Sequence, residues 1–202
     1  MLEPAHIHFK VYKPFEMLSQ LHSNDAKESR NKRFLSELYN FPEGIMPVGR
    51  LDEKSEGLLL LTTDGKLSDQ VNRSGIEKEY YVQLDGEITN EAIELLQKGV
   101  EIGFHGKKYA TKATTVNKLP TPPFLSPPDK KLRIGRHRPT SWISITITEG
   151  KFRQVRKMTA AVGFPTLRLI RMRIGNVLLT NLSPGDVIPI HNLSLEVSNL
   201  TF

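Results

Sequence analysis

A run of four leucines, Leu58–Leu61, is the feature that most constrains how this chain folds. With the two threonines that follow, the run predicts a short buried strand, which an Asp-Gly turn ends. A charged loop precedes this strand, in the stretch Gly49–Gly65 (GRLDEKSEGLLLLTTDG). Asp52 in this loop is held close to a rigid, packed element, which is a common place for a functional side chain. Taken alone, such an aspartate more often caps a turn or pairs with a neighbour such as Arg50.

Hydrophobic periodicity and turn residues predict the other strands and helices along the chain. The expected strands cover residues 6–18 (with a turn at Lys13-Pro14), 78–86, 109–118, 140–150, 167–175 and 177–190. The expected helices cover residues 26–40, 66–75, 89–99 and 151–163. Strands and helices mixed in this order indicate the α+β class.

The charges of the chain are divided unequally between its two halves. Residues 1–101 carry 12 Lys/Arg and 18 Asp/Glu, a net charge of −6. Residues 102–202 carry 16 Lys/Arg and 4 Asp/Glu, a net charge of +12. So basic a block indicates a polyanionic partner, most simply nucleic acid, and the alternative is a solubilising face without a partner.

The composition restricts the environment and the kinds of site. The chain has no cysteine, so it forms no disulfide and no thiolate metal site. No apolar run approaches the length that spans a membrane, and the N-terminus has no apolar signal core, so we expect a cytoplasmic protein. The chain lacks the glycine motifs of nucleotide-binding loops, and its six histidines show no metal-ligand spacing beyond a weak His-x-His pair. We therefore expect no nucleotide cofactor and no metal.

Residues 119–139 (LPTPPFLSPPDKKLRIGRHRP) contain six prolines and five Lys/Arg. Proline at this density excludes a regular helix or strand. The segment is expected to be either a disordered insert or a long functional loop.

The helix expected at 151–163 carries an apolar stripe and a basic face. The apolar stripe consists of Phe152, Val155, Thr159 and Val162. Arg153, Arg156 and Lys157 lie together on a neighbouring face, which suits a phosphate backbone. Two other interpretations stay open: a solvated basic face, or one arginine turned inward to keep a carboxylate ionised by lowering its pKa. Tyr80, on the strand at 78–86, is by itself more often a core ring.

Three motifs in order resemble the RsuA-type branch of the ribosomal RNA pseudouridine synthases. They are the Gly-Arg-Leu-Asp loop before a leucine-rich strand, the stretch KEYYV, and the stretch EGKFRQVRKMTAAVG. The resemblance extends from about Lys10 to Ile190. It implies one α+β catalytic domain over residues 1–202, built on a bent, mostly antiparallel sheet with a central active-site cleft. The sequence shows no separate N-terminal RNA-binding domain of the S4 type, which most of the branch carries.

The resemblance also implies the reaction and the residues that perform it. One uridine of ribosomal RNA, expected to be large-subunit RNA, is isomerised to pseudouridine by a monomer without a cofactor. Asp52 matches the catalytic aspartate, Tyr80 the active-site tyrosine, and Arg156 the arginine that pairs with the aspartate. RNA contacts are expected from the loop, the helix and the proline-rich segment, at Arg50, Leu51, Arg153, Lys157, Lys130, Lys131, Arg133, Arg136 and Arg138.

Two alternatives stay open. A non-catalytic RNA-binding protein of ribosome assembly explains the basic half equally well, but it does not need Asp52, Tyr80 and Arg156 together. A glycosidase-like hydrolase needs two carboxylates facing the bond, and nothing in the sequence requires Glu53 or Glu56 to face a substrate.

Overall fold

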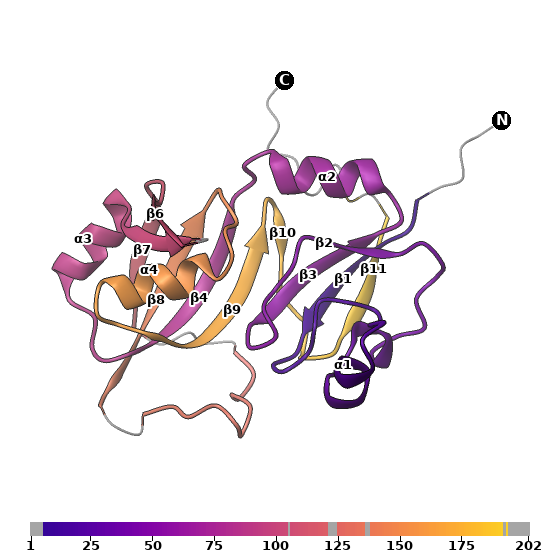
Figure 1. Ribbon diagram of the computed structural model, residues 1–202, viewed down its shortest axis with the longest axis horizontal. Coiled ribbons are helices and arrows are strands. Elements are labelled where there is room, and N and C mark those ends of the chain that lie inside the picture. The colour runs from indigo at the N-terminus through magenta and orange to yellow at the C-terminus, as the bar shows by residue number, and fades with distance from the viewer. Residues whose placement is uncertain (1–5, 105, 121–124, 136–137, 192, 194–202) are drawn as a thin grey trace. The chain divides into compact units, whose positions relative to one another are not determined.

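The computed structural model describes residues 6–104, 106–120, 125–135, 138–191 and 193. The chain forms two compact units (Figure 1). The first unit combines Met1–Ile76 with Arg171–Phe202, and the second consists of Glu77–Ile170. Strand β9 (Thr166–Ile174) begins in the second unit and ends in the first.

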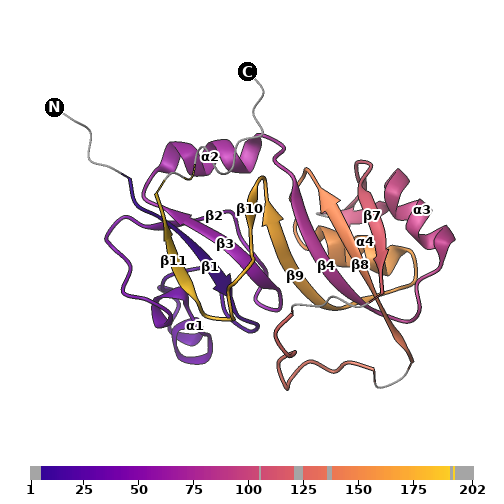
Figure 2. The same cartoon turned by 180° about the vertical axis from the view of Figure 1, so that it is seen from behind.

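The first unit is built around β1 (His8–Lys13), as both Figure 1 and Figure 2 show. β1 pairs antiparallel with β11 (Val187–Ile190) on one side and with β3 (Glu56–Thr62) on the other. β2 (Met46–Val48) pairs antiparallel with β3, and β10 (Val177–Leu178) with the end of β9. The predicted leucine strand is confirmed as β3, and every one of its residues is buried.

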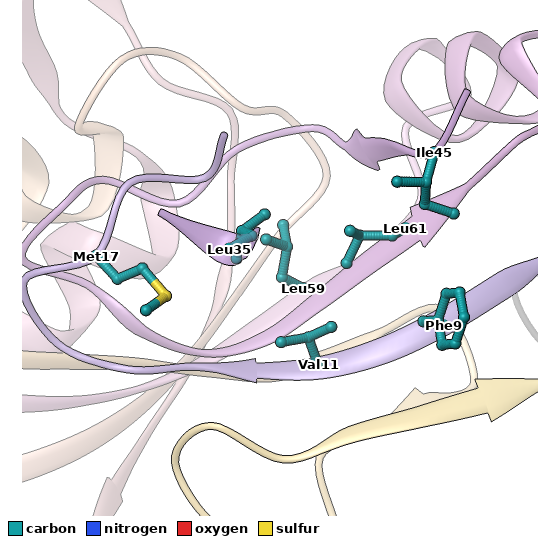
Figure 3. Close-up of a cluster of buried hydrophobic side chains, with 7 residues drawn as sticks. All are labelled: Phe9, Val11, Met17, Leu35, Ile45, Leu59 and Leu61. Carbon is teal, nitrogen blue, oxygen red and sulfur yellow. The ribbon is translucent and has the colours of Figure 1, made fainter. Parts of the chain in front are cut away.

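The hydrophobic core of the first unit explains why β3 is so apolar. Alternate residues of a strand point to opposite faces, and β3 needs apolar residues at both because both faces are covered. One of its faces packs on a cluster that β1 and the segments after it complete (Figure 3). The cluster comprises Phe9, Val11, Met17, Leu35, Ile45, Leu59 and Leu61.

Helices α1 and α2 belong to the described part of the first unit, and α1 is shorter than predicted. α2 (Gly65–Arg73) begins at Asp64, whose carboxylate accepts hydrogen bonds from the first-turn amides, and packs against β2 and β3. The helix expected over 26–40 is instead α1 (Ala26–Asn31) followed by an extended stretch and a 3₁₀ turn (Leu35–Glu37). The prediction was wrong because the backbone at 33–35 bonds to segment 18–20, which buries Phe34 and Leu35.

The second unit contains strands of an antiparallel sheet and a hairpin. β4 (Lys78–Asp85) pairs with β8 (Thr140–Ile147), and β8 pairs with β7 (Thr115–Leu119). β5 (Glu101–Phe104) and β6 (Lys107–Ala110) form the hairpin. Every one of these pairings is antiparallel, as the resemblance implied for most of the sheet.

The second unit also holds α3 (Asn90–Lys98), which packs against β7, and α4 (Gln154–Ala161), which packs against β5. The single strand expected over 109–118 is wrong, since the chain leaves the hairpin at Thr111 and bonds to the end of α3 before β7 begins. Gly99, with φ +91°, permits this close approach, because a Cβ there would lie 2.3 Å from the Thr111 carbonyl oxygen.

The α+β class is confirmed by this arrangement of helices α1–α4 and antiparallel strands in the described residues. Within the described part of residues 119–139, β7 ends at Leu119 and no further helix or strand follows before β8, as predicted from the prolines. No helix in the described ranges is long and apolar enough to cross a membrane.

Candidate active site

The Gly-Arg-Leu-Asp loop connects β2 to β3 in the first unit. Gly49 has φ +68°, and a Cβ at this position would lie 2.8 Å from Oδ1 of Asn72 on α2. Glycine is therefore required here both by the backbone and by the neighbouring helix. Arg50 is exposed, Leu51 is buried, and Asp52 is partly exposed. Three successive residues of the loop are thus an exposed cation, a buried apolar side chain and a partly exposed carboxylate.

Ser19 holds the backbone of this loop at Leu51. The Leu51 amide donates to Ser19 Oγ at 3.0 Å, and the Ser19 hydroxyl donates to the Leu51 carbonyl at 2.9 Å. Ser19 is only 4% exposed, so both hydrogen bonds are shielded from water. The loop also closes on itself, since the Ser55 amide donates to the Asp52 carbonyl at 3.0 Å. The residues on either side of Asp52 are therefore fixed.

Lys13, the last residue of β1, is fully buried beneath the same loop. Its Nζ donates to the carbonyls of Pro14 at 2.8 Å, Met17 at 2.7 Å and Glu53 at 3.3 Å. Burial lowers the pKa of Lys13 to about 7, although the nearby carboxylates of Glu56, Asp52 and Glu53 favour the charged form.

Removing the Ser19 hydroxyl is expected to loosen the loop. Ser19→Ala leaves a buried Leu51 amide without its acceptor, and such a group costs about 1–3 kcal/mol. We expect the free energy of unfolding in urea to fall by this amount and the Leu51 amide to exchange faster with deuterium. Ser36→Ala is the matched control, because its exposed hydroxyl also donates to a backbone carbonyl. Equal effects of the two substitutions would contradict a special role for Ser19.

Tyr80 lies on β4 in the second unit. Tyr80 pairs with Ile145 of β8. It is only 8% exposed. β4 places Tyr80, Val82 and Leu84 on one face, because alternate residues of a strand share a face. The ring is therefore held rigidly by the sheet of this unit.

The basic residues expected on α4 occupy different environments. Arg153 is exposed and takes a left-handed conformation (φ 53°) at the N-terminus of the helix. Arg156 is partly buried, and its Nη1 lies 3.4 Å from the Thr166 carbonyl oxygen. Lys157 is partly buried and donates to the Gly103 carbonyl at 2.7 Å. Of these three residues, Arg153 alone is exposed, as a solvated basic face would require of all three.

Phe152 does not join the apolar stripe predicted for this helix. It precedes α4 and is 65% exposed, so this prediction was wrong. The left-handed turn at Arg153 starts the helix at Gln154. Val155 and Thr159 of the predicted stripe are buried, together with Gln154 and Met158.

The proline-rich segment carries most of the remaining predicted cations. Lys130, Lys131 and Arg133 are exposed. Arg138 is paired with Asp85 at 3.2 Å, and Arg136 lies outside the described residues. The buried Arg168 of β9 donates to the Ser126 carbonyl at 3.0 Å and so ties the segment to the second unit.

The predicted residues are thus distributed over both units of the chain. Arg50, Leu51 and Asp52 belong to the first unit, and all the other predicted site residues belong to the second. The sequence did not indicate Ser19 or the buried position of Lys13, because both act through contacts between distant segments. Within the described ranges, no three His, Asp or Glu side chains are grouped so as to hold a metal ion.

Comparisons with known proteins agree with the motifs. A family model described as RNA pseudouridylate synthase matches residues 7–161. Ribosomal large subunit pseudouridine synthase E of Xanthomonas campestris pv. campestris is 39% identical over 176 residues, covering 86% of this chain and 90% of that protein. The protein of the same name from Vibrio parahaemolyticus is also 39% identical over 176 residues, covering 86% of this chain and 69% of that protein.

A solved structure shows the same fold. A crystal structure of pseudouridylate synthase superimposes with a TM-score of 0.73 at 26% identity, covering 95% of this chain and 73% of that one. Human RNA pseudouridylate synthase domain containing 1, at 15% identity and a TM-score of 0.52, shares the fold. The resemblance drawn from the three motifs is confirmed by the family model and by these relatives: the chain belongs to the RNA pseudouridylate synthase family.

Proposed function

We propose that this protein isomerises a specific uridine of large-subunit ribosomal RNA to pseudouridine. The observation that carries the proposal is the identity of 39% to two relatives named ribosomal large subunit pseudouridine synthase E, over 86% of the chain. The reaction breaks the bond between N1 and C1′ of the ribose, rotates the base and joins C5 to C1′. The hydrogen on C5 leaves as a proton and N1 gains one, so no oxidant or cofactor is needed.

Asp52, Tyr80 and Arg156 carry this reaction in our proposal. The target base must leave its stack to turn over, so it is extruded into a pocket. An ionised Asp52 serves as the nucleophile or as an anionic stabiliser when the glycosidic bond breaks. Arg156 pairs with the carboxylate and orients it, and Tyr80 stacks on the extruded base and helps to remove the C5 proton. Support comes from the ordered motifs and from the rigid backbone around Asp52.

The remaining predicted residues bind the RNA around the target. Arg50 enters the space that the extruded base vacates, next to Leu51. The cations of α4 and of the proline-rich segment contact phosphates. We propose that residues 1–202 act as one catalytic domain, as a monomer, without metal or cofactor, in the cytoplasm.

The contribution of the proline-rich segment is measurable from salt dependence. We expect the triple variant Lys130→Ala, Lys131→Ala and Arg133→Ala to bind RNA with a log-affinity slope against log salt that is reduced by about 2 to 3, since each phosphate contact contributes about 0.7–0.9. The matched control replaces three exposed cations of the first unit, Lys27, Lys66 and Arg73, by alanine. The role of the segment is refuted if both variants keep the native slope.

Tritium release from ribosomal RNA labelled at uridine C5 tests the function directly. We expect the native protein to release tritium from large-subunit RNA and not from small-subunit RNA. Binding without release on either RNA would instead support a ribosome-assembly protein that uses the same fold without catalysis.

A further inference from the structure

The most exposed large apolar side chain in the described residues is Phe152, at 65%. A phenyl ring in this position gains nothing from the core of its own unit. It lies in the turn before α4, next to Arg153, whose left-handed backbone (φ 53°) is uncommon for a residue other than glycine. Exposed aromatic rings beside cations are typical of surfaces that bind unpaired nucleic acid.

Phe152 is the end of an alternating series of rings and ammonium groups in the second unit. Lys157 Nζ lies 5.4 Å from the centre of the Phe152 ring and 5.7 Å from that of Phe104. Lys151 Nζ lies 5.4 Å from the centre of the Phe104 ring and 5.2 Å from that of Tyr109. We call this series, Phe152, Lys157, Phe104, Lys151 and Tyr109, the aromatic ladder.

The hairpin β5–β6 and the start of α4 hold the ladder in place. Phe104 pairs with Lys107, so Tyr109, two residues further along β6, projects from the same face of the hairpin. The Tyr109 hydroxyl donates to Glu149 Oε2 at 2.6 Å, and Gln154 Nε2 donates to Glu149 Oε1 at 2.6 Å. Glu149 therefore fixes the Tyr109 end of the ladder, and Phe152 is the more exposed end.

The cations of the ladder keep hydrogen-bonding capacity. Lys157 donates one hydrogen bond to the Gly103 carbonyl, and an ammonium group has three N–H donors. Lys157 and Lys151 are held over ring faces, which orients them at little further cost in side-chain entropy. Lys157 lies over the accessible ring of Phe152, and the exposed Arg153 is the next residue along the chain.

We propose that the aromatic ladder binds an unpaired segment of the RNA substrate, with one base stacked on Phe152 and neighbouring phosphates at Lys157 and Arg153. The inference rests on the proposed function, because it assumes that the ligand is RNA. Stacking requires a base whose face is free, whereas a duplex offers these side chains only its phosphates. The ladder therefore selects a target uridine that lies beside single-stranded nucleotides.

Substitution of Phe152 tests the proposal, and its exposure makes misfolding a minor concern. We expect Phe152→Leu to bind a short single-stranded RNA at least about 5-fold more weakly, since stacking on a ring contributes about 1–3 kcal/mol per base. Phe152→Trp retains native affinity. A duplex of the same sequence binds equally to all three proteins. Leu95→Ala, which removes an exposed apolar side chain of α3 in the same unit, is the matched control and leaves binding unchanged.

The fluorescence of a modified base reports stacking directly, and binding through charge alone would not change it. In a single-stranded RNA containing 2-aminopurine, stacking quenches the fluorescence, and we expect this quenching with the native protein and Phe152→Trp but not with Phe152→Leu. The proposal is overturned if Phe152→Leu binds single-stranded RNA as the native protein does, or if it weakens the duplex equally.

Tritium release from ribosomal RNA separates this inference from the proposed function. If the native protein releases tritium and Phe152→Leu binds normally, only the ladder is refuted. If Phe152-dependent binding to single-stranded RNA is found without tritium release from any ribosomal RNA, only the catalytic function is refuted. If the native protein releases tritium and Phe152 also contributes to RNA binding, both proposals hold. The base stacked on Phe152 is not the one that reacts, so we then expect Phe152→Leu to raise KM with little change in kcat.

Discussion

Asp52→Asn is expected to reduce tritium release from C5-labelled large-subunit RNA by at least about a thousandfold, as the loss of a catalytic nucleophile does in other enzymes. The amide preserves the size of the side chain but carries no negative charge, so it neither attacks nor stabilises a developing positive charge. RNA affinity is expected to stay close to native, because the proposed phosphate contacts come from cations. Single-turnover assays with enzyme in excess measure the chemical step without product release.

The neighbouring acid provides the control for this experiment. Glu53→Gln makes the same acid-to-amide change one residue away, where the carboxylate pairs with Lys32 at 2.8 Å. We expect nearly native tritium release from this variant. If Asp52→Asn retains the native rate, then Asp52 is a structural residue of the loop and the proposed chemistry is wrong.

Lys13 is expected to make the stability of the protein depend on pH. Its pKa is lowered by burial from 10.5 to about 7, and the Arg171 guanidinium also acts in this direction, against the carboxylates of Glu56, Asp52 and Glu53. Between pH 7 and 10.5 the unfolded chain therefore binds a proton at Lys13 that the folded protein has released. Stability contributed by this group rises with pH across that window, by up to about 5 kcal/mol in total. Below pH 7 the cost of the buried charge is present in full.

Urea unfolding of the native protein and Lys13→Met, from pH 6 to pH 9, measures this effect. Methionine has no charge at any pH, so the difference between the two free energies of unfolding isolates Lys13. We expect native minus variant to be flat below pH 7 and to rise above it by about 1.4 kcal/mol per pH unit. The hydrogen bonds that methionine cannot make shift the curve without changing its slope. A difference that stays constant to pH 9 would mean that the three carbonyls hold Lys13 charged.

The elements that the sequence predicted well are those whose signals are local. The leucine run of β3, the helices expected at 66–75 and 89–99, and the strand expected at 140–150 depend on neighbours a few residues away. The wrong predictions lie where the backbone forms hydrogen bonds with a distant segment instead of continuing the predicted helix or strand. Segment 18–20 draws the backbone at 33–35 out of the helix predicted there, and the end of α3 interrupts the strand expected at 109–118.

The residues of the candidate site also divide into those that local motifs predicted and those that depend on contacts between distant segments. Motif order pointed to Asp52, Tyr80 and Arg156, because each lies in a recognisable local stretch. The support of the Asp52 loop was not predictable, since Ser19 lies 32 residues from Leu51 and Lys13 lies 40 residues from Glu53. Phe152 was misassigned because a periodic stripe cannot reveal that Arg153 adopts a left-handed backbone.

The division of the first unit between the two ends of the chain affects how the protein folds during synthesis. The second unit is contiguous and has all its residues once Ile170 is made, whereas β1 receives its partner β11 only after the whole second unit has been made. At about 5–20 residues per second, the roughly 175 residues between these strands take about 10–35 s. During that interval one edge of β1 exposes unpaired backbone groups, which favours pairing with other chains. Slow translation or truncation before β11 is therefore expected to promote aggregation of nascent chains through β1.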